Sequence, residues 1–373
     1  LAIEDLHWAD ASTLDFLGQI LELARSRCVL ILLTYRPEFL PPWPMCPHFS
    51  ELTLCRISLS EARRMAQNIA GATPLPDEIL QRIATRSDGV PLFIEELTKM
   101  LLEARGSGEW QPYSAQPDTA AVSIPETLRG SLTARLDHLS VAKSIAQLAS
   151  VLGREFSYTL IRLVSEMDDD RLQEALAELI GAELLFQRGL PPSATFVFKH
   201  VLVQEAAYLS LLKARRAEYH MRTATVLVDR FEDLIDRHPE LAAHHYAAAG
   251  KPEHACDFWH RAGQRALEAS ADVEAAGHLR LALRQLELLP DRGEQVAREV
   301  KCLITLGSAL TASCGYAAAE VEEVFARART LCQSLGDIEQ LYAALMGLHG
   351  FYQVRGSLQP AVAVAKELGV IAE

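Results

Sequence analysis

Leu1-Ala-Ile-Glu-Asp-Leu-His-Trp-Ala-Asp10 is the stretch around which the rest of the sequence is organised. Three apolar residues open it, and two adjacent acids, Glu4 and Asp5, follow them. Many nucleotide hydrolases present a Mg²⁺-linked acid and a water-polarising acid at the end of an apolar strand. The pattern therefore predicts a strand that ends in a chemical site. Because the sequence starts inside this strand and without a methionine, we expect it to be the C-terminal part of a longer protein.

The residues after these acids predict a strand–helix–strand unit. Apolar residues recur at Leu14, Leu17 and Leu21, the spacing of an amphipathic helix, with Ser12 as the expected N-cap. Cys28–Leu33 is a continuous apolar run, which is typical of a strand buried on both faces of a parallel sheet.

Polar residues follow this second strand as well. Thr34 and Arg36 come directly after the apolar run, as Glu4 and Asp5 come after the first strand. In open α/β sheets, ligands bind at the carboxyl ends of the strands. We therefore expect these four side chains to converge on one crevice.

Composition limits the class of protein. The 373 residues carry a formal net charge of −13, which argues against a general nucleic-acid or anionic-membrane surface. The apolar runs are too short to span a bilayer. Seven cysteines without a CxxC pair favour reduced thiols and a cytoplasmic location.

The remaining sequence is predominantly helical, so the predicted fold class is mainly α with a truncated α/β part. Helices are predicted at about 60–70, 76–87 and 91–105, and a possible edge strand at Glu51–Cys55. A Gly-, Ser- and Pro-rich linker follows at 106–122. The predicted domains are 1–57, a helical lid at 58–105, a winged-helix-like domain at 123–235 and helical repeats at 236–373.

The last two domains are predicted from local patterns. Helices at 125–139, 141–152, 158–165 and 170–181 precede two short strands, 184–187 and 195–198, and one long helix from His200 to Val228. Beyond Pro239 the sequence forms helical hairpins. The series Leu303, Leu306, Gly307, Leu310, Tyr316, Phe325 and Ala328 approximates the tetratricopeptide pattern.

Five runs taken together carry a family resemblance: IEDLHWAD, LLTYRPEF, SDGVPLFIEELTKML, IPETLRGSLTARLD and FVFKHVLVQEAAY. Their order resembles the predicted-ATPase module of STAND-type, AAA-related signalling proteins. In bacteria that module is often fused to a class III adenylate or guanylate cyclase or a LuxR-type domain and followed by tetratricopeptide repeats. The resemblance implies ATP or ADP and Mg²⁺ as ligands, and a protein partner or small ligand on the repeats.

The resemblance also implies roles for the acids and for the polar residues after the second strand. IEDLHWAD is similar to the Walker B motif, in which Glu4 would hold Mg²⁺ through water and Asp5 would polarise the attacking water. Glu4 departs from the family, which more often has aspartate there. Thr34 and Arg36 are similar to sensor 1, where the guanidinium would contact the γ-phosphate. The alternatives are an acidic strand-to-helix turn and a surface arginine before a proline.

Three further residues are implied to contact the nucleotide. Gly89 and Pro91 are similar to the GxP element, in which the proline packs on adenine, and the alternative is a helix stop followed by a helix start. His200 occupies the place of the histidine that reads the ADP β-phosphate in related switches. Val201 stands where those switches have aspartate, and a helix cap or a packed histidine is the alternative.

A phosphate-binding loop of the form GxxxxGK[ST] does not occur in these 373 residues. We therefore expect this stretch alone not to hydrolyse ATP. Two hypotheses remain: a nucleotide-dependent switch that regulates a fused cyclase or another output domain, and a non-enzymatic interaction scaffold with a decayed nucleotide site. A fragment of a LuxR-type regulator is a further alternative.

Overall fold

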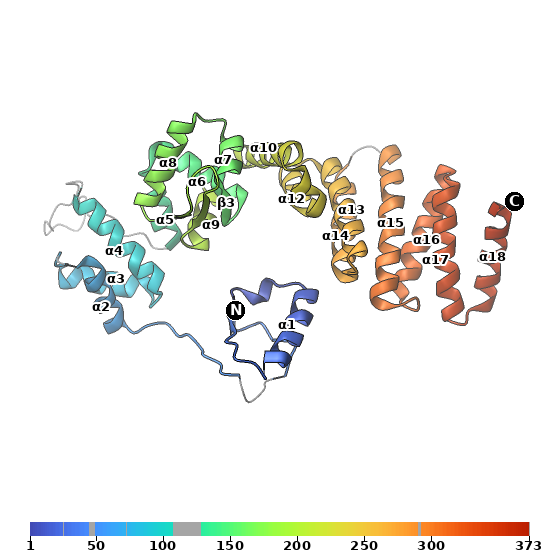
Figure 1. Ribbon diagram of the computed structural model, residues 1–373, viewed down its shortest axis with the longest axis horizontal. Coiled ribbons are helices and arrows are strands. Elements are labelled where there is room, and N and C mark those ends of the chain that lie inside the picture. The colour runs from blue at the N-terminus through green and yellow to red at the C-terminus, as the bar shows by residue number, and fades with distance from the viewer. Residues whose placement is uncertain (25, 45–48, 72, 107–127, 290–291, 373) are drawn as a thin grey trace. The chain divides into compact units, whose positions relative to one another are not determined.

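Helices dominate the computed structural model, which describes residues 1–24, 26–44, 49–71, 73–106, 128–289 and 292–372 (Figure 1). This confirms the predicted fold class. The chain divides into two compact units, one formed by residues 1–50 with 224–373 and the other by residues 51–223. The predicted linker at 106–122 lies, apart from its first residue, outside the described residues.

Residues 1–50 contain the predicted strand–helix–strand unit. Strand β1 (Ala2–Ile3) pairs in parallel with β2 (Leu32–Leu33), with Ala2 opposite Leu32 and Ile3 opposite Leu33. A short 3₁₀ helix, η1 (Leu6–Trp8), and helix α1 (Ala11–Ala24) connect them. Leu17 and Leu21 of α1 are buried, as their spacing predicts.

The N-cap prediction for α1 is wrong. The helix begins at Ala11, and the Thr13 N–H donates to Asp10 Oδ1 over 2.6 Å. Asp10 therefore accepts the hydrogen bond that caps the first turn, whereas Ser12 lies inside the helix.

The prediction of a doubly buried strand at Cys28–Leu33 is also wrong. Only its last two residues pair, and Leu30 and Leu32 are 84% and 58% exposed. A two-stranded sheet leaves most of its side chains in contact with solvent. The possible edge strand at Glu51–Cys55 is not formed either, and Leu54 is 96% exposed.

Helices α2 (Leu59–Ala70), α3 (Asp77–Ser87) and α4 (Pro91–Gly106) form a three-helix cluster at the predicted lid. Ser58 and Glu61 start α2 with a capping box. The core of the cluster is apolar and includes Ala62, Ala66, Leu80, Ile83, Ile94, Leu97 and Leu101.

A helix–sheet module follows, in the predicted winged-helix region. It consists of α5 (Leu128–Asp137), α6 (Ser140–Leu152), α7 (Tyr158–Ser165), α8 (Asp169–Gly181) and α9 (Val201–Leu209) around strands β3 (Glu155–Ser157), β4 (Leu185–Arg188) and β5 (Thr195–Phe198). The antiparallel strand order is β3-β5-β4. Phe156 stacks on Phe196 with ring centroids 5.7 Å apart. Strand β3 was not predicted, because three residues are too few to show an alternating pattern.

The predicted single helix from His200 to Val228 is two helices. Helix α9 ends at Leu209, and α10 (Lys213–Arg230) begins after a short break. The Ser210 hydroxyl donates to the Ala207 carbonyl and accepts a bond from Gln147 of α6. A serine hydroxyl can take the place of a helical backbone group as a hydrogen-bond partner, which favours serine at the end of a helix.

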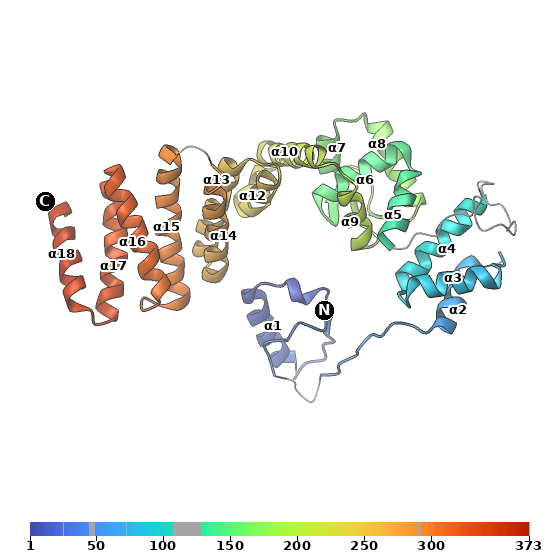
Figure 2. The ribbon, with the colours of Figure 1, turned by 180° about the vertical axis from the view of Figure 1, so that it is seen from behind.

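The C-terminal region is a stack of helical hairpins, as predicted. Helices α11 (Glu232–Arg237) and α12 (Pro239–Ala248) precede α13 (Pro252–Glu268), α14 (Asp272–Leu286), α15 (Arg292–Cys314), α16 (Ala319–Leu335), α17 (Ile338–Val354) and α18 (Leu358–Ala372). Consecutive helices from α12 onward contact one another (Figure 2). The pattern residues Leu303, Leu306, Leu310, Phe325 and Ala328 are buried in one shared core.

Candidate functional site

The end of β1 is tied to the end of β2 by backbone and hydroxyl bonds. The Thr34 N–H donates to the Ile3 carbonyl over 3.0 Å, and the Leu6 N–H donates to the Thr34 carbonyl over 2.8 Å. The Asp5 N–H donates to Thr34 Oγ1 over 3.0 Å. The parallel register therefore places Glu4, Asp5 and Thr34 at one edge of the sheet.

Asp5 turns the chain at this edge. It adopts a left-handed conformation, with φ of 56°, immediately before the 3₁₀ helix. Aspartate tolerates this region better than most residues because its short polar side chain can bond locally. The acidic strand-to-helix turn, which was the structural alternative, is thus present, and it leaves both acids exposed.

Arg36 lies two residues beyond Thr34 in a tight turn. The Phe39 N–H donates to its carbonyl over 3.0 Å, and its side chain is exposed. The structure therefore places all four predicted residues of this region at or just beyond the carboxyl ends of the two strands. Carboxylate and hydroxyl oxygens are suitable ligands for Mg²⁺, which usually takes only one or two carboxylates from a protein and keeps water.

Gly89 has a structural reason to be glycine. Its φ is +69°, and a Cβ at this position would lie 2.4 Å from the Ile57 carbonyl oxygen. The Ile57 N–H donates to the Gly89 carbonyl over 3.0 Å, and Arg56 pairs with Asp88. Pro91 is the exposed first residue of α4. The helix-stop and helix-start interpretation of this element is thus sufficient to explain its sequence.

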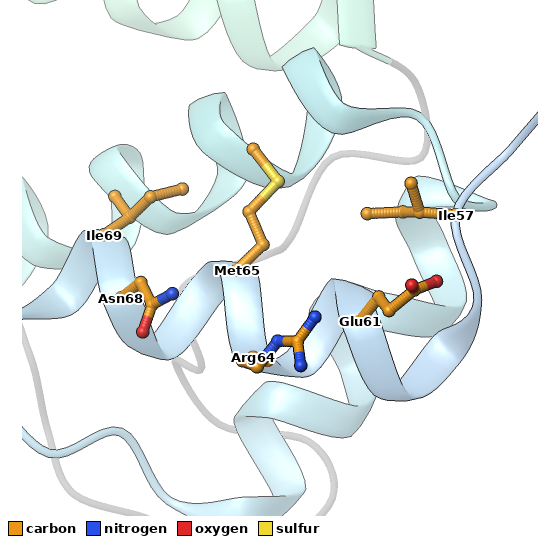
Figure 3. A pocket seen from close by; sticks show the side chains of 6 residues that line it. All are labelled: Ile57, Glu61, Arg64, Met65, Asn68 and Ile69. Carbon is orange, nitrogen blue, oxygen red and sulfur yellow. The ribbon is translucent and has the colours of Figure 1, made fainter. Parts of the chain in front are cut away.

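A pocket adjoins Ile57 on the surface of α2. It has a volume of about 480 Å³ and lies between apolar and polar side chains (Figure 3). Its lining consists of Ile57, Glu61, Arg64, Met65, Asn68 and Ile69. Glu61 hydrogen-bonds Ser58, which lowers the pKa of its carboxyl group. The sequence contained no signal for this pocket, because its lining residues also fit an ordinary amphipathic helix.

His200 is the N-cap of α9. Its Nδ1 accepts a hydrogen bond from the Leu202 N–H over 3.2 Å, so the capping alternative is realised. The accepting Nδ1 requires the neutral tautomer with its proton on Nε2. Gly89, Pro91 and His200 all belong to the unit of residues 51–223. Contact of these residues with a nucleotide stays a prediction.

Lys199, next to His200, belongs to a cluster of four charges. Its Nζ donates to Glu95 Oε1 over 2.7 Å and to Glu183 Oε2 over 3.1 Å. Lys99 bonds the same two carboxylates. Hydrogen bonds from Lys99 and Lys199 lower the pKa of Glu183 to about 2. Burial alone would raise the pKa of Glu95, but its bonds to the two lysines outweigh burial and lower it.

Glu96 forms a buried ion pair with Arg135. The carboxyl and guanidinium side chains are 3% and 4% exposed. Glu95 and Glu96 both lie in the N-terminal half of α4, and each carboxylate is paired with a cationic side chain from outside the helix. The sequence of a helix does not show which distant residues will pair with its charged side chains.

The repeats contain a larger groove of about 880 Å³. Its lining comes from α13, α15 and Gln340 of α17, and includes Asp257, His260, Arg261, Arg298, Lys301 and Thr305. His260 Nε2 and Thr305 Oγ1 lie 3.1 Å apart, joining α13 to α15. Burial, assisted by the charge of Lys301, lowers the pKa of His260.

Most charges of this groove are paired. Arg298 bonds Glu253 over 2.9 Å and Asp257 over 3.2 Å, and Arg261 bonds Asp236 over 2.9 Å. Cations and carboxylates are therefore in balance around it, which suits a polar ligand without a large net charge.

Two absences concern the described part of the chain. No three His, Cys, Asp or Glu side chains there gather closely enough to hold a metal ion. None of the helices found there has the length and apolar character needed to cross a membrane.

The comparisons with known proteins identify similar chains. No family model matches the sequence. An uncharacterised protein of Rhizobium meliloti (strain 1021) is 26% identical over 327 residues, which cover 84% of this chain and 30% of that protein. The chain thus spans about a third of the length of this relative.

A solved structure is similar over the whole chain and 62% of its own length. It is a signal transduction ATPase with numerous domains, with a tetratricopeptide repeat sensor, from Pyrococcus horikoshii, at 12% identity and a TM-score of 0.39.

Proposed function

We propose that this chain is the switching and sensing part of a STAND-type signalling ATPase. Glu4, Asp5, Thr34 and Arg36 form the wall of the nucleotide site that carries Mg²⁺ and the attacking water. The observation that carries this proposal is the parallel register of β1 and β2, with the Asp5 N–H bonded to Thr34 Oγ1 over 3.0 Å. It places two carboxylates, a hydroxyl and a guanidinium-bearing turn at one sheet edge.

The chemistry of this edge follows from its groups. Glu4 offers an oxygen ligand to Mg²⁺ through water, and Asp5 polarises the attacking water. Arg36 offers a planar fork of donors to a γ-phosphate, and loss of that phosphate on hydrolysis removes its partner. Mg²⁺ supplies charge neutralisation of the phosphates when it is bound. Gly89, Pro91 and His200 read the base and the β-phosphate in this proposal.

The phosphate-binding loop must come from sequence other than these 373 residues, and the length of the Rhizobium relative leaves room for such a segment. We place the protein in the cytoplasm. Its repeats bind a protein partner or a small polar ligand in the groove between α13 and α15, and this ligand biases the ATP–ADP equilibrium. A fused cyclase or LuxR-type domain is the expected output.

The test uses the protein produced from its complete gene. Arg36→Ala removes a charge-assisted hydrogen bond to the γ-phosphate, and we expect ATP hydrolysis to fall about ten- to hundredfold. Arg27→Ala, which changes an exposed arginine of the same region, is the matched control. Glu4→Gln is expected to weaken the Mg²⁺ dependence of ATP binding, with Glu38→Gln as its control.

Unchanged ATP affinity and turnover in both site variants would contradict the assignment. That outcome would favour the second function, a non-enzymatic scaffold that acts through its repeats. The balanced, polar groove of about 880 Å³ is the observation in favour of this alternative.

A further inference from the structure

Two buried cysteines meet between neighbouring helices of the repeats. Cys256 lies on α13 and Cys302 on α15, and each is 1% exposed. Their thiols share a hydrogen bond, so the two sulfur atoms are already in contact. The residues are far apart in the sequence, and the packing of the repeats brings them together.

Polar contacts on both sides of the cysteines hold α13 and α15 in register. One turn before Cys302, Arg298 of α15 bonds Glu253 of α13 over 2.9 Å, and it also bonds Asp257 over 3.2 Å. One turn after the cysteines, His260 Nε2 of α13 and Thr305 Oγ1 of α15 lie 3.1 Å apart. The same alignment of the two helices therefore places the thiols opposite one another and keeps them there.

The two helices also form walls of the groove of about 880 Å³. Asp257 and Lys301, which line the groove, are the sequence neighbours of Cys256 and Cys302. The cysteines themselves are buried and do not belong to its lining. A covalent bond between them would therefore act on the groove by fixing the distance between its walls.

Two thiols in contact can be oxidised to a disulfide. Each thiol gives up its proton and one electron, and an S–S bond of about 2.05 Å replaces the hydrogen bond. A small disulfide such as oxidised glutathione accepts the two electrons. One thiolate breaks the glutathione S–S bond and forms a mixed disulfide, and the second thiolate then displaces the remaining glutathione. Two reduced glutathione molecules leave and take up the two protons.

The surroundings of the pair favour an uncharged product. Hydrogen bonding to Cys256 and burial raise the pKa of the Cys302 thiol, and the carboxylates of Asp257 and Glu299 raise this pKa further. A thiolate or a sulfinate would keep a negative charge near these carboxylates, whereas a disulfide carries none. Because burial also makes the closed pair unreactive, oxidation proceeds when α13 and α15 part transiently.

We propose that Cys256 and Cys302 form a reversible disulfide, which locks α13 to α15 and fixes the width of the groove between them. Disulfide formation is independent of the proposed function, whereas its effect on nucleotide binding through the groove rests on that function. In a reducing compartment such a bond is usually transient and serves redox sensing. The repeats then respond to the oxidation of thiols as well as to a ligand in the groove.

The first experiment looks for the bond itself. The protein produced from its complete gene is equilibrated with reduced or oxidised glutathione at about pH 8, which raises the thiolate fraction, and its free thiols are then blocked under denaturing conditions. We expect mass spectrometry of a tryptic digest to find the peptides of Cys256 and Cys302 joined after oxidation and separate after reduction. Absence of the joined peptide at equilibrium would overturn the proposal.

Cys332 is the internal control for this experiment. It lies on α16 and is 0% exposed, but it bonds no other thiol in the described part of the chain. Cys332 should therefore stay free while the other buried pair is oxidised. Joining of Cys302 to Cys332 as often as to Cys256 would show that unfolding, and not the contact between α13 and α15, selects the partner, and would refute the proposal.

Thermal unfolding measures the effect of the bond on the repeats. A disulfide that closes a long loop restricts the unfolded chain, so we expect oxidation to raise the unfolding midpoint of the repeats by about 5 °C. Cys302→Ala should abolish this difference. Cys332→Ala, the matched variant, also removes a buried sulfur and should lower both midpoints but keep the difference. Equal midpoints of the oxidised and reduced wild-type protein, or a difference that survives Cys302→Ala, would exclude the lock.

ADP binding to the complete protein tests the effect that rests on the proposed function. We expect the ADP affinities of the oxidised and reduced protein to differ about fivefold or more, and those of Cys302→Ala to be equal. Equal affinities of the wild-type protein, together with the joined peptide, would overturn the regulatory role and leave the disulfide and the proposed function in place. A protein that binds no nucleotide in either state would overturn the proposed function, and the joined peptide would still decide the disulfide.

Discussion

Phe325 is held between two glycines that belong to different helices. A Cβ built on Gly307 of α15 would lie 2.4 Å from the Phe325 Cζ atom, and one built on Gly347 of α17 would lie 2.4 Å from Cε2. The phenylalanine comes from α16 and is 4% exposed. Its ring therefore fills the space that both missing side chains leave, so the three helices approach closely. We predict that Gly307→Ala destabilises the repeats.

The size of the effect follows from this geometry. Carbon atoms in good contact are about 3.5–4.0 Å apart, so the ring would have to retreat by about 1 Å. The Phe325 ring cannot move far towards α17, because it already packs against Gly347 there. Overpacking of this kind costs about 1–3 kcal/mol, and alanine recovers up to about 1 kcal/mol of helix propensity. A net loss of about 1–2 kcal/mol corresponds to a fall of about 2–8 °C in the unfolding midpoint.

Thermal unfolding followed by circular dichroism measures this loss, with Gly277→Ala as the matched control. Gly277 lies in α14, where a Cβ would meet nothing within 4 Å, so alanine there should leave the midpoint unchanged or raise it. The second variant, Gly307→Ala with Phe325→Leu, should lose less than the sum of its single changes, because leucine vacates the ring position. Equal midpoints for the two glycine variants, or strict additivity in the double variant, would refute the reasoning.

Three further outcomes are expected. Glu95 and Glu183 have lowered pKa values, so their contribution to the contact between α4 and the helix–sheet module is present above about pH 4.5 and is lost as the pH falls towards 2. The protection of the α4 amides against hydrogen exchange, relative to the intrinsic rate at each pH, should fall over that window, and constant protection would contradict the charge cluster. Burial lowers the pKa values of His260 and His278, so protonation favours the unfolded state and the repeats should lose stability below about pH 6.5; their replacement by glutamine should flatten this dependence in thermal unfolding. Gly89→Ala should destabilise the three-helix cluster by about 2 kcal/mol or more in denaturant unfolding, because the obstructing atom is a backbone oxygen; a neutral result would show that Ile57 can move.

The candidate site shows which structural features can be predicted from local sequence. Two short apolar runs, each followed by polar residues, are sufficient to predict a parallel pair with its acids at one edge, because side chains at the ends of parallel strands meet at the same edge. The capping of α1 was misassigned to Ser12, since Asp10 and Ser12 are both good caps and their choice depends on where the helix starts. The roles of Glu4, Asp5, Arg36 and His200 towards a nucleotide stay predictions.

Burial and partners over long distances were harder to predict. Cys28–Leu33 appeared to be a core strand by composition, yet its exposure depends on how many strands flank it and not on its own residues. Likewise, the partners of Glu96 and Lys199 lie 39 and 104 residues away, so no spacing rule within a helix could indicate them.

The sequence by itself determined the helical character of the chain, the approximate bounds of the helices between Leu59 and Gly181 and the parallel pair that carries the acids, because these depend on periodicity and on residues within a few turns. Tertiary structure alone decided that α4 is fastened to α5 through Glu96 and Arg135, and that Phe325 occupies the space above Gly307 and Gly347. The physical reason is that the energetic effect of a buried charge or of a missing side chain depends on the residue that it contacts. The fold brings that residue into contact, and the local sequence does not specify it.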